Sequence, residues 1–176
     1  MAAEGVTVVD DGRLPGGLAS RPFDGEGLPT RRTVVVERGV LRSWLLDTYA
    51  ARKLGLAATG SATRSPGGSP SAAPTNFWLE PGRSSLEEMI AGTERGLLVT
   101  YLFGHGFNPV TGDFSRGAAG LWIEDGRLAF PVDEVTIAGN LGDMLTSIDA
   151  IGREVEWLGA IASPPLRIAQ MTVAGA

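Results

Sequence analysis

The chain contains no cysteine, which excludes disulfide bonds, thiolate catalysis and every metal site built on cysteine ligands. It also contains a single histidine, His105, so no pair of imidazoles is available to hold a catalytic metal. The carboxylate of Asp113 follows eight residues later, and this spacing matches no recognised metal-ligand motif. We therefore expect no metal or other cofactor to be bound by this chain alone.

Basic clusters and long apolar runs are also lacking. The net charge is −5, and no basic run is longer than a pair such as Arg31-Arg32, which argues against a surface for nucleic acid. No apolar run approaches the roughly 18 residues that a membrane-spanning helix needs, and the N-terminus lacks the charged and apolar regions of a signal peptide. We expect a soluble, cytoplasmic protein that binds neither nucleic acid nor membrane.

Glycine, in contrast, is abundant, with 25 of 176 residues scattered among short apolar runs. This distribution predicts many tight turns between short strands. The hydrophobic content of 43% argues against a flexible, glycine-rich protein without a core. The length suits a single domain covering residues 1–176.

Two hairpins are expected. Residues 34–36 and 40–45 are joined by a turn containing Gly39, and residues 121–123 and 128–130 by Asp125-Gly126, which favours a type I′ turn. Further short strands are expected at residues 6–9, 76–80, 96–103, 155–158 and 166–173. Trp44, Trp78, Trp122 and Trp157 all fall on expected strands, and core packing is the default interpretation for such aromatic residues.

Three helices are expected between these strands. The first begins after Asp47 as N-cap and ends near Gly55. The second has a capping box of Ser84 and Glu87 and ends by Gly92. The third begins at Asn140, with apolar residues at helical spacing: Leu141, Met144, Leu145, Ile148 and Ile151.

The fold class that follows is α+β, with mostly antiparallel sheets and two or three short helices. The sequence leaves open whether a sheet closes into a barrel. Residues 1–32 are rich in glycine and proline and are predicted to form an extended arm. Residues 59–75 are rich in Ser, Gly, Pro, Ala and Thr, and are predicted to form a long flexible loop.

The residues themselves indicate little catalytic chemistry. His105, Asp113 and Ser115 could compose a triad, but no Gly-x-Ser-x-Gly turn presents the serine, so an autonomous hydrolase is a remote hypothesis. No glycine run is followed by the lysine or helix start of a phosphate loop.

Several segments together resemble the C-terminal domain of the TldD/PmbA family, metallopeptidases once described as modulators of DNA gyrase. The matching segments run in consistent order along nearly the whole chain: residues 23–27, 29–33, 39–41, 75–76, 80–82, 108–109, 111–115, 131–132, 137–140 and 163–175. The segment from Ser163 to Ile168 is more similar to the PmbA-type (TldE) subunit.

This resemblance implies a longer, two-domain protein whose TldD-type subunit carries a His-Glu-x-x-x-His zinc helix in its N-terminal domain and a cysteine ligand in its C-terminal domain. That helix motif is absent here, and no cysteine stands near Ala162-Ser163, where the family places it. The resemblance therefore implies a chain without the family's N-terminal domain, acting as a non-catalytic component. Zinc is then expected in a catalytic partner.

The expected partners are a TldD-like catalytic subunit, or a second copy through self-association, together with a peptide substrate. Strand edges could hold an extended peptide by its main chain. The candidate residues lining the peptide chamber are those of one glycine-rich loop: His105, Asn108, Gly112, Asp113, Phe114 and Ser115. The alternative is a binding or assembly module that takes no part in peptide cleavage.

Overall fold

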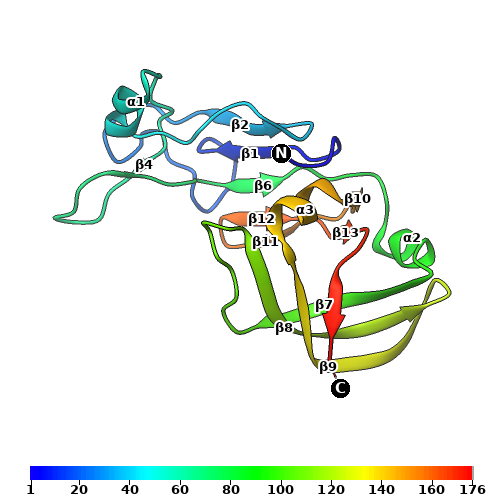
Figure 1. Ribbon diagram of the computed structural model, residues 1–176. Helices are drawn as coiled ribbons and strands as arrows, with labels where there is room; N and C mark the ends of the chain where they lie inside the picture. The colour runs from blue at the N-terminus through cyan, green and yellow to red at the C-terminus, as the bar shows by residue number, and fades with distance from the viewer. Residues whose placement is uncertain (176) are drawn as a thin grey trace. The chain divides into compact units, whose positions relative to one another are not determined.

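The computed structural model describes residues 1–175, and within this range the chain divides into two compact units. Within the described range, unit 1 comprises residues 1–5, 82–154 and 165–175, and unit 2 comprises residues 6–81 and 155–164. Figure 1 shows the strands and helices of both units. None of the helices in the described range is long and apolar enough to cross a membrane.

Unit 2 is built on one six-stranded sheet in the order β11-β12-β6-β1-β2-β3. Its strands are β1 (Val8–Asp11), β2 (Arg32–Glu37), β3 (Val40–Leu41), β6 (Phe77–Leu79), β11 (Glu156–Leu158) and β12 (Ile161–Ser163). All neighbours pair antiparallel except β12 and β6, which are parallel. A separate small hairpin joins β4 (Ala62–Thr63) to β5 (Ser71–Ala72), and helix α1 (Thr48–Leu54) follows β3.

Buried polar side chains connect the segments of unit 2. Asn76 is fully buried and donates to the carbonyl of Asp11 and the hydroxyl of Ser20, while its own Oδ1 accepts from the backbone N–H of Ala19. Asp24 accepts from two backbone amides of its own turn and from the N–H of Ala62. These bonds attach the glycine-rich N-terminal segment to the sheet and to the β4–β5 hairpin.

Unit 1 is built on a four-stranded sheet in the order β14-β9-β8-β7. Its strands are β7 (Arg95–Phe103), β8 (Asp113–Glu124), β9 (Arg127–Asn140) and β14 (Thr172–Ala174). A second pair, β10 (Ile148–Ile151) and β13 (Leu166–Ile168), and the helices α2 (Leu86–Ala91) and α3 (Leu141–Thr146) complete the unit. The core is formed by Ala118, Val135 and Ile137, against which Leu97, Val99, Leu102, Phe114, Val132 and Met171 pack.

The predicted fold class is confirmed: the described chain is α+β, with predominantly antiparallel strands and three short helices. Both predicted hairpins form, as β2–β3 and β8–β9. Asp125 and Gly126 both have positive φ, as a type I′ turn requires. The sheets of residues 1–175 are open, so none closes into a barrel.

Two local predictions are wrong. The cap of α2 is Ser85 with Glu88, one residue later than the predicted pair Ser84 and Glu87. Helix α3 stops at Thr146, and Ile148 and Ile151 lie in β10 instead of on its apolar face. Ile148 pairs with Ile168 on β13, a contact distant in sequence that overrides the local helical pattern.

The tryptophans are less buried than core packing predicts. Trp44 lies outside the strands and is 55% exposed, and Trp157 is 42% exposed. Trp78 and Trp122 lie on strands and are half-buried. Trp157 packs against Trp78 with the ring centroids 5.9 Å apart and the ring planes tilted by 49°, so these two residues contact each other across strands β11 and β6.

The single-domain organisation and the flexibility of residues 59–75 remain predictions. Within the predicted arm, residues 1–32, β1 is an interior strand of the sheet, paired with both β2 and β6.

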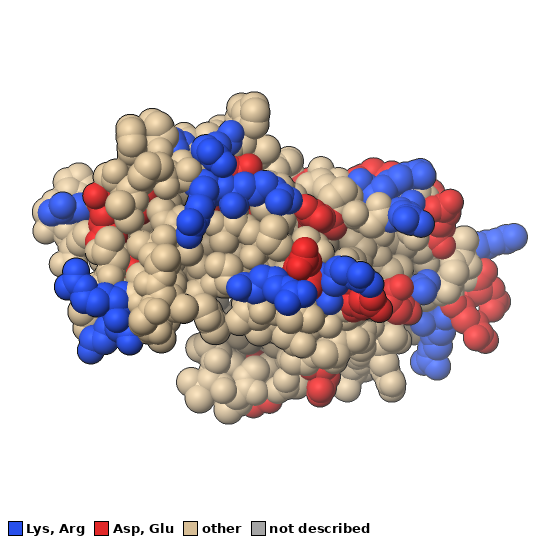
Figure 2. All heavy atoms as spheres, turned by 90° about the horizontal axis from the view of Figure 1, so that it is seen from above, with Lys and Arg blue, Asp and Glu red and all other residues tan. Residues whose placement is uncertain are grey.

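Basic and acidic side chains lie next to one another on the face shown in Figure 2. The ion pairs at the surface of the described chain include Arg32–Glu80 and Arg42–Glu37, and such exposed pairs contribute little to stability.

Candidate functional site

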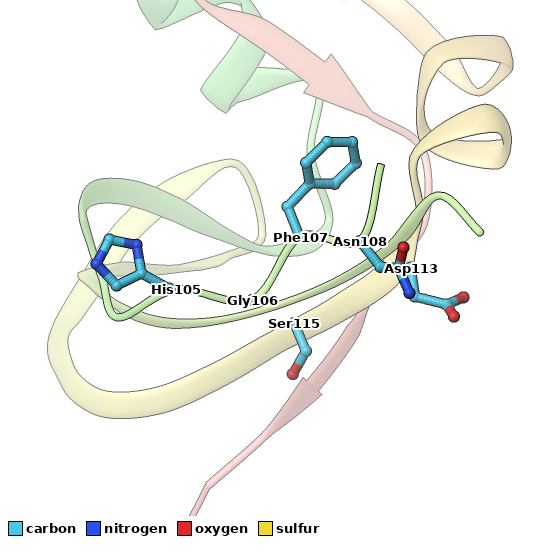
Figure 3. A pocket seen from close by; sticks show the side chains of 6 residues that line it. All are labelled: His105, Gly106, Phe107, Asn108, Asp113 and Ser115. Carbon is cyan, nitrogen blue, oxygen red and sulfur yellow. The ribbon is translucent and has the colours of Figure 1, made fainter. Parts of the chain in front are cut away.

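The candidate loop connects β7 to β8 in unit 1 and contains the only histidine of the chain. It surrounds a hollow of about 390 Å³, shown in Figure 3 and lined by His105, Gly106, Phe107, Asn108, Asp113 and Ser115. Gly104 and Gly112 have φ values of 76° and 79°, which residues with a Cβ adopt only with strain. Glycine therefore shapes both ends of the loop.

The loop extends past the end of β7 and pairs with the first residues of β8. The N–H of Ser115 donates to the carbonyl of Gly106 at 2.6 Å, and the N–H of Asn108 donates to the carbonyl of Asp113 at 2.9 Å. Between these bonds, Phe107 forms a bridge with Phe114. A Cβ on Gly106 would lie 1.5 Å from the carbonyl oxygen of Ser115, so any larger residue would separate the two segments.

Two of the candidate side chains hold the loop in shape. Oδ1 of Asn108 accepts from the N–H groups of Val110 and Thr111, at 2.9 and 3.3 Å. Oδ2 of Asp113 accepts from the hydroxyl of Thr111 at 2.6 Å. Both side chains are exposed, so they remain accessible from solvent while supporting the turn.

Asn140 connects the loop to the start of α3. Its Nδ2 donates to the carbonyl of Thr111 at 2.9 Å, and its Oδ1 accepts from the N–H of Gly142 as the helix cap. The N–H of Leu141 donates to the carbonyl of Gly112 at 2.8 Å. Phe114 packs against the core of the sheet. The loop is thus anchored on two sides.

The structure does not assemble His105, Asp113 and Ser115 into a triad. In Figure 3 the imidazole and the carboxylate lie at opposite ends of the loop, and the hydroxyl of Ser115 points toward neither. No hydrogen bond joins any two of these side chains within residues 1–175. A nucleophilic hydroxyl needs a base within hydrogen-bond reach, and this arrangement does not supply one.

The described residues do not fit the zinc centre that the resemblance to the TldD/PmbA family implies. A hydrolytic zinc needs three protein ligands from His, Cys and carboxylates. The one imidazole is on an exposed loop, thiols are absent, and no group of three His, Cys, Asp or Glu residues converges within the described part of the chain. No metal chemistry is therefore assigned to this chain.

Sequence reasoning missed two features beside the loop. Tyr101 and Phe103 stack on each other with ring centroids 6.3 Å apart, and Tyr101 is 66% exposed. Arg116 stands in β8 between the core-packed residues Phe114 and Ala118. The sequence pattern that could have placed Arg116 beside the core is the alternation of Phe114, Arg116 and Ala118, because alternate residues of a strand lie on the same face.

Comparison with known proteins identifies the family. The model of the PmbA/TldA metallopeptidase C-terminal domain matches residues 1–175. The chain belongs to this family. Metalloprotease PmbA of Escherichia coli O157:H7 is 42% identical over 171 residues, which cover 97% of this chain and 36% of that protein. A PmbA homologue of Buchnera aphidicola (subspecies Baizongia pistaciae) is 37% identical over 172 residues, with the same coverage.

Solved structures of the family have the same fold. TldE from Thermococcus kodakarensis superimposes with a TM-score of 0.89 and 30% identity, covering 99% of this chain and 40% of that chain. A proposed modulator of DNA gyrase from Thermotoga maritima gives a TM-score of 0.89 and 36% identity, covering 98% and 40%. The PmbA/TldA domain described here thus spans about a third of the length of the curated relatives it matches.

Proposed function

We propose that this chain is a non-catalytic, PmbA/TldE-like component of a zinc peptidase system in the cytoplasm. The proposal is supported by membership of a metallopeptidase family over residues 1–175, together with a single histidine, no cysteine and no converging group of three metal-ligating side chains among the described residues. In this proposal, cleavage uses a metal that is bound outside residues 1–176, on a His-Glu-x-x-x-His helix.

The role of the chain in this proposal is to bind the peptide and to form part of the chamber around it. The hollow beside the β7–β8 loop is open to solvent. The side chains of Asn108 and Asp113 accept hydrogen bonds from other residues of the loop. Such a surface suits contacts to the main chain of many peptides better than the reading of one side chain. The candidate contact residues are His105, Asn108, Gly112, Asp113, Phe114 and Ser115.

Affinity capture tests the proposal. The tagged chain is incubated with lysate of its source organism, and the recovered proteins are searched for the His-Glu-x-x-x-His motif. Peptide cleavage by the recovered complex should require both proteins and should stop when a chelator removes the zinc. Recovery of complexes without such a protein, in repeated trials, would contradict the proposal.

The loop is tested separately in the reconstituted complex. We expect His105→Ala to weaken peptide cleavage without changing stability, because this exposed side chain makes no hydrogen bond within residues 1–175. Thr146→Ala, an exposed change on α3, is the control. Unchanged peptide cleavage in complexes with His105→Ala and with Asp113→Asn would show that the loop does not contribute to cleavage.

The alternative is an assembly module that does not contact the substrate. The exposed aromatic pair of Tyr101 and Phe103 favours it, since such residues are enriched in protein interfaces. Under this alternative, the partner is recovered in the same capture experiment, but substitutions in the loop leave peptide cleavage unchanged.

A further inference from the structure

The four-stranded sheet of unit 1 has a core side and an outer side. Ala118, Val135 and Ile137 lie on the core side, where each is at most 8% exposed. Alternate residues of a strand point to opposite faces, so the residues that alternate with these three lie on the outer side. This outer face is open to solvent, as the exposed Thr136 on β9 shows. Its composition indicates what it can contact.

An aromatic ridge, formed by Tyr101 and Phe103, stands at the β7 edge of the outer face. The two rings stack with their centroids 6.3 Å apart, and Tyr101 is 66% exposed and Phe103 37% exposed. Phe103 pairs with Gly117 of β8, and a Cβ on Gly117 would lie 2.1 Å from the ring of Phe103. The glycine thus allows the ring to lie directly on the backbone of β8, with Tyr101 stacked beside it.

Beside the ridge, the outer face is low and uncharged. The side chains of this low region on β8, β9 and β14 are small, and none carries a charge: Gly117, Ala119, Thr136, Ala138, Thr172 and Ala174. The nearest charged residues along β9 are Glu134 and Asp133, at a bulge beyond the end of the pairing with β14. Although 20% of the chain is charged, this region has no charge, and the centres of protein interfaces show the same depletion. An uncharged region beside exposed aromatic rings is typical of a surface that another protein covers.

We infer that the outer face packs against the outer face of a second copy of this chain, related to the first by a two-fold axis. Under two-fold symmetry a surface must be complementary to itself. The ridge stands at one edge of the sheet and the low region extends from β8 to β14, the other edge. A two-fold axis between them therefore places the ridge of each copy over the low region of the other. This inference goes beyond the proposed peptidase role and does not depend on it.

The size of the outer face indicates how strong the dimer is. Leu98, Leu121 and Pro131 pair in a further row on the same side, so the uncharged surface follows β8 from residue 115 to residue 121. With strands about 4.8 Å apart and residues about 3.3 Å apart, its flat area is about 400 Å². Two copies then bury about 800 Å², to which the projecting rings add, and this is the size of weak, transient interfaces. We therefore expect a dimer that dissociates at micromolar concentrations.

Sedimentation equilibrium of the chain between about 10 μM and about 1 mM measures the dissociation constant of the dimer. We expect Thr136→Lys to raise this constant at least about tenfold, because it places a like charge from each copy within the interface. Thr146→Lys makes the same change at an exposed position of α3 and should leave the constant unchanged. Thr136 lies on β9, and β8 separates it from β7, so this variant also distinguishes face-to-face packing from pairing through the β7 edge.

Single cysteines test the same contact by cross-linking, because the chain has no cysteine of its own. Thr136→Cys and Thr172→Cys each place one thiol on the outer face, and Thr146→Cys places one on α3. A two-fold axis brings equivalent residues of the two copies together, and a disulfide forms only over a short distance. Under mild oxidation we expect a covalent dimer from at least one of the two outer-face variants, and no covalent dimer from Thr146→Cys on a non-reducing gel.

The outcomes separate this surface from the others. An unchanged dissociation constant in Thr136→Lys overturns the inference and assigns association to another surface, such as the β7 edge. A wild-type chain that is monomeric at the highest concentration also overturns it and leaves a different protein as the occupant of the outer face. If circular dichroism shows that Thr136→Lys does not fold, the cysteine variants decide, and the absence of a cross-link at both outer-face positions overturns the inference. All of these measurements use the isolated chain, so failure of the capture experiment would not affect them.

Discussion

Among single residues, Asp10 is the most unusual, because its carboxyl group is buried in an interior strand. It is 2% exposed, and Oδ1 accepts hydrogen bonds from the N–H of Thr75 at 2.5 Å and from its hydroxyl at 3.0 Å. Burial raises the pKa of Asp10 above its ordinary value, and the Thr75 bonds only partly oppose this effect. The neighbouring Asp11 raises the pKa further, whereas Arg21 lowers it.

The raised pKa fixes the direction of a pH effect. A carboxyl whose pKa is higher in the folded state binds its proton more tightly there, so it favours folding most at low pH. This contribution is lost as the pH rises through the folded-state pKa of Asp10. We expect Asp10→Asn to abolish this loss of stability and to make the protein more stable at pH 7. The asparagine side chain keeps an acceptor for Thr75 and gains a donor toward Thr33, the residue opposite on β2.

Urea unfolding of the wild type and of Asp10→Asn between about pH 3 and pH 7 measures how the unfolding free energy of each depends on pH. The difference in unfolding free energy should be greatest at neutral pH and should shrink in acid. Asp143→Asn, at an exposed position on α3, is the control and should retain the pH dependence of the wild type. A neutral-pH destabilisation by Asp10→Asn would show that the charged form is preferred in the fold.

At the scale of the elements, helix α2 depends on its N-terminal cap. The hydroxyl of Ser85 accepts from the N–H of Glu88 at 3.1 Å, and the carboxylate of Glu88 accepts from the N–H of Ser85 at 2.7 Å. The pKa of Glu87 is lowered, chiefly by its own backbone N–H and then by Ser85. We expect Ser85→Ala to reduce the unfolding free energy by about 1 kcal/mol, as measured by urea unfolding.

Ser84→Ala provides the matched control for the cap. Ser84 uses its backbone carbonyl, which accepts from Arg153, and its side chain makes no hydrogen bond within residues 1–175. The change should alter stability by less than about 0.5 kcal/mol. Equal losses from both substitutions would indicate that the cap has no special role.

Elements with local signals were predictable from the sequence. The Asp125-Gly126 hairpin and the α1 cap at Asp47 depend on neighbouring residues, and both form as predicted. Contacts between distant segments were not predictable, which is why the end of α3 and the parallel pairing of β12 with β6 were missed. In the candidate site, the loop and its glycines were predicted, but the Asn140 anchor and the unpaired Arg116 depend on pairing across the sheet.

At the scale of the whole molecule, β7 is an edge strand of the four-stranded sheet. This nine-residue strand pairs with β8 only, and its other edge has no backbone partner within residues 1–175. Arg95 is its only charged residue, although a bulge near Thr100 interrupts the regular pairing with β8. Charges and proline commonly protect such edges against pairing with another chain, and β7 has little of either.

We therefore expect the chain to self-associate in solution, and Tyr101→Lys to reduce this association. A lysine beside the free edge adds charge repulsion and removes an exposed aromatic ring. Light scattering over a range of protein concentrations measures the change. Gln170→Lys adds the same charge at an exposed position outside the strands and should leave association unchanged.

A monomer at every concentration, for the wild type as well as the variants, would contradict this expectation. It would also favour a different polypeptide, rather than a second copy, as the partner of this chain.

The interleaving of the two units has a consequence for biosynthesis. A ribosome releases the chain from its N-terminus, yet the sheet of unit 2 requires residues 156–163, where β12 joins β6 and Trp157 meets Trp78. Unit 2 therefore cannot complete its sheet, and one side of β6 stays uncovered, until residue 163 has left the exit tunnel. A chain interrupted before that point exposes a strand edge, the kind of surface that makes incomplete chains prone to aggregate.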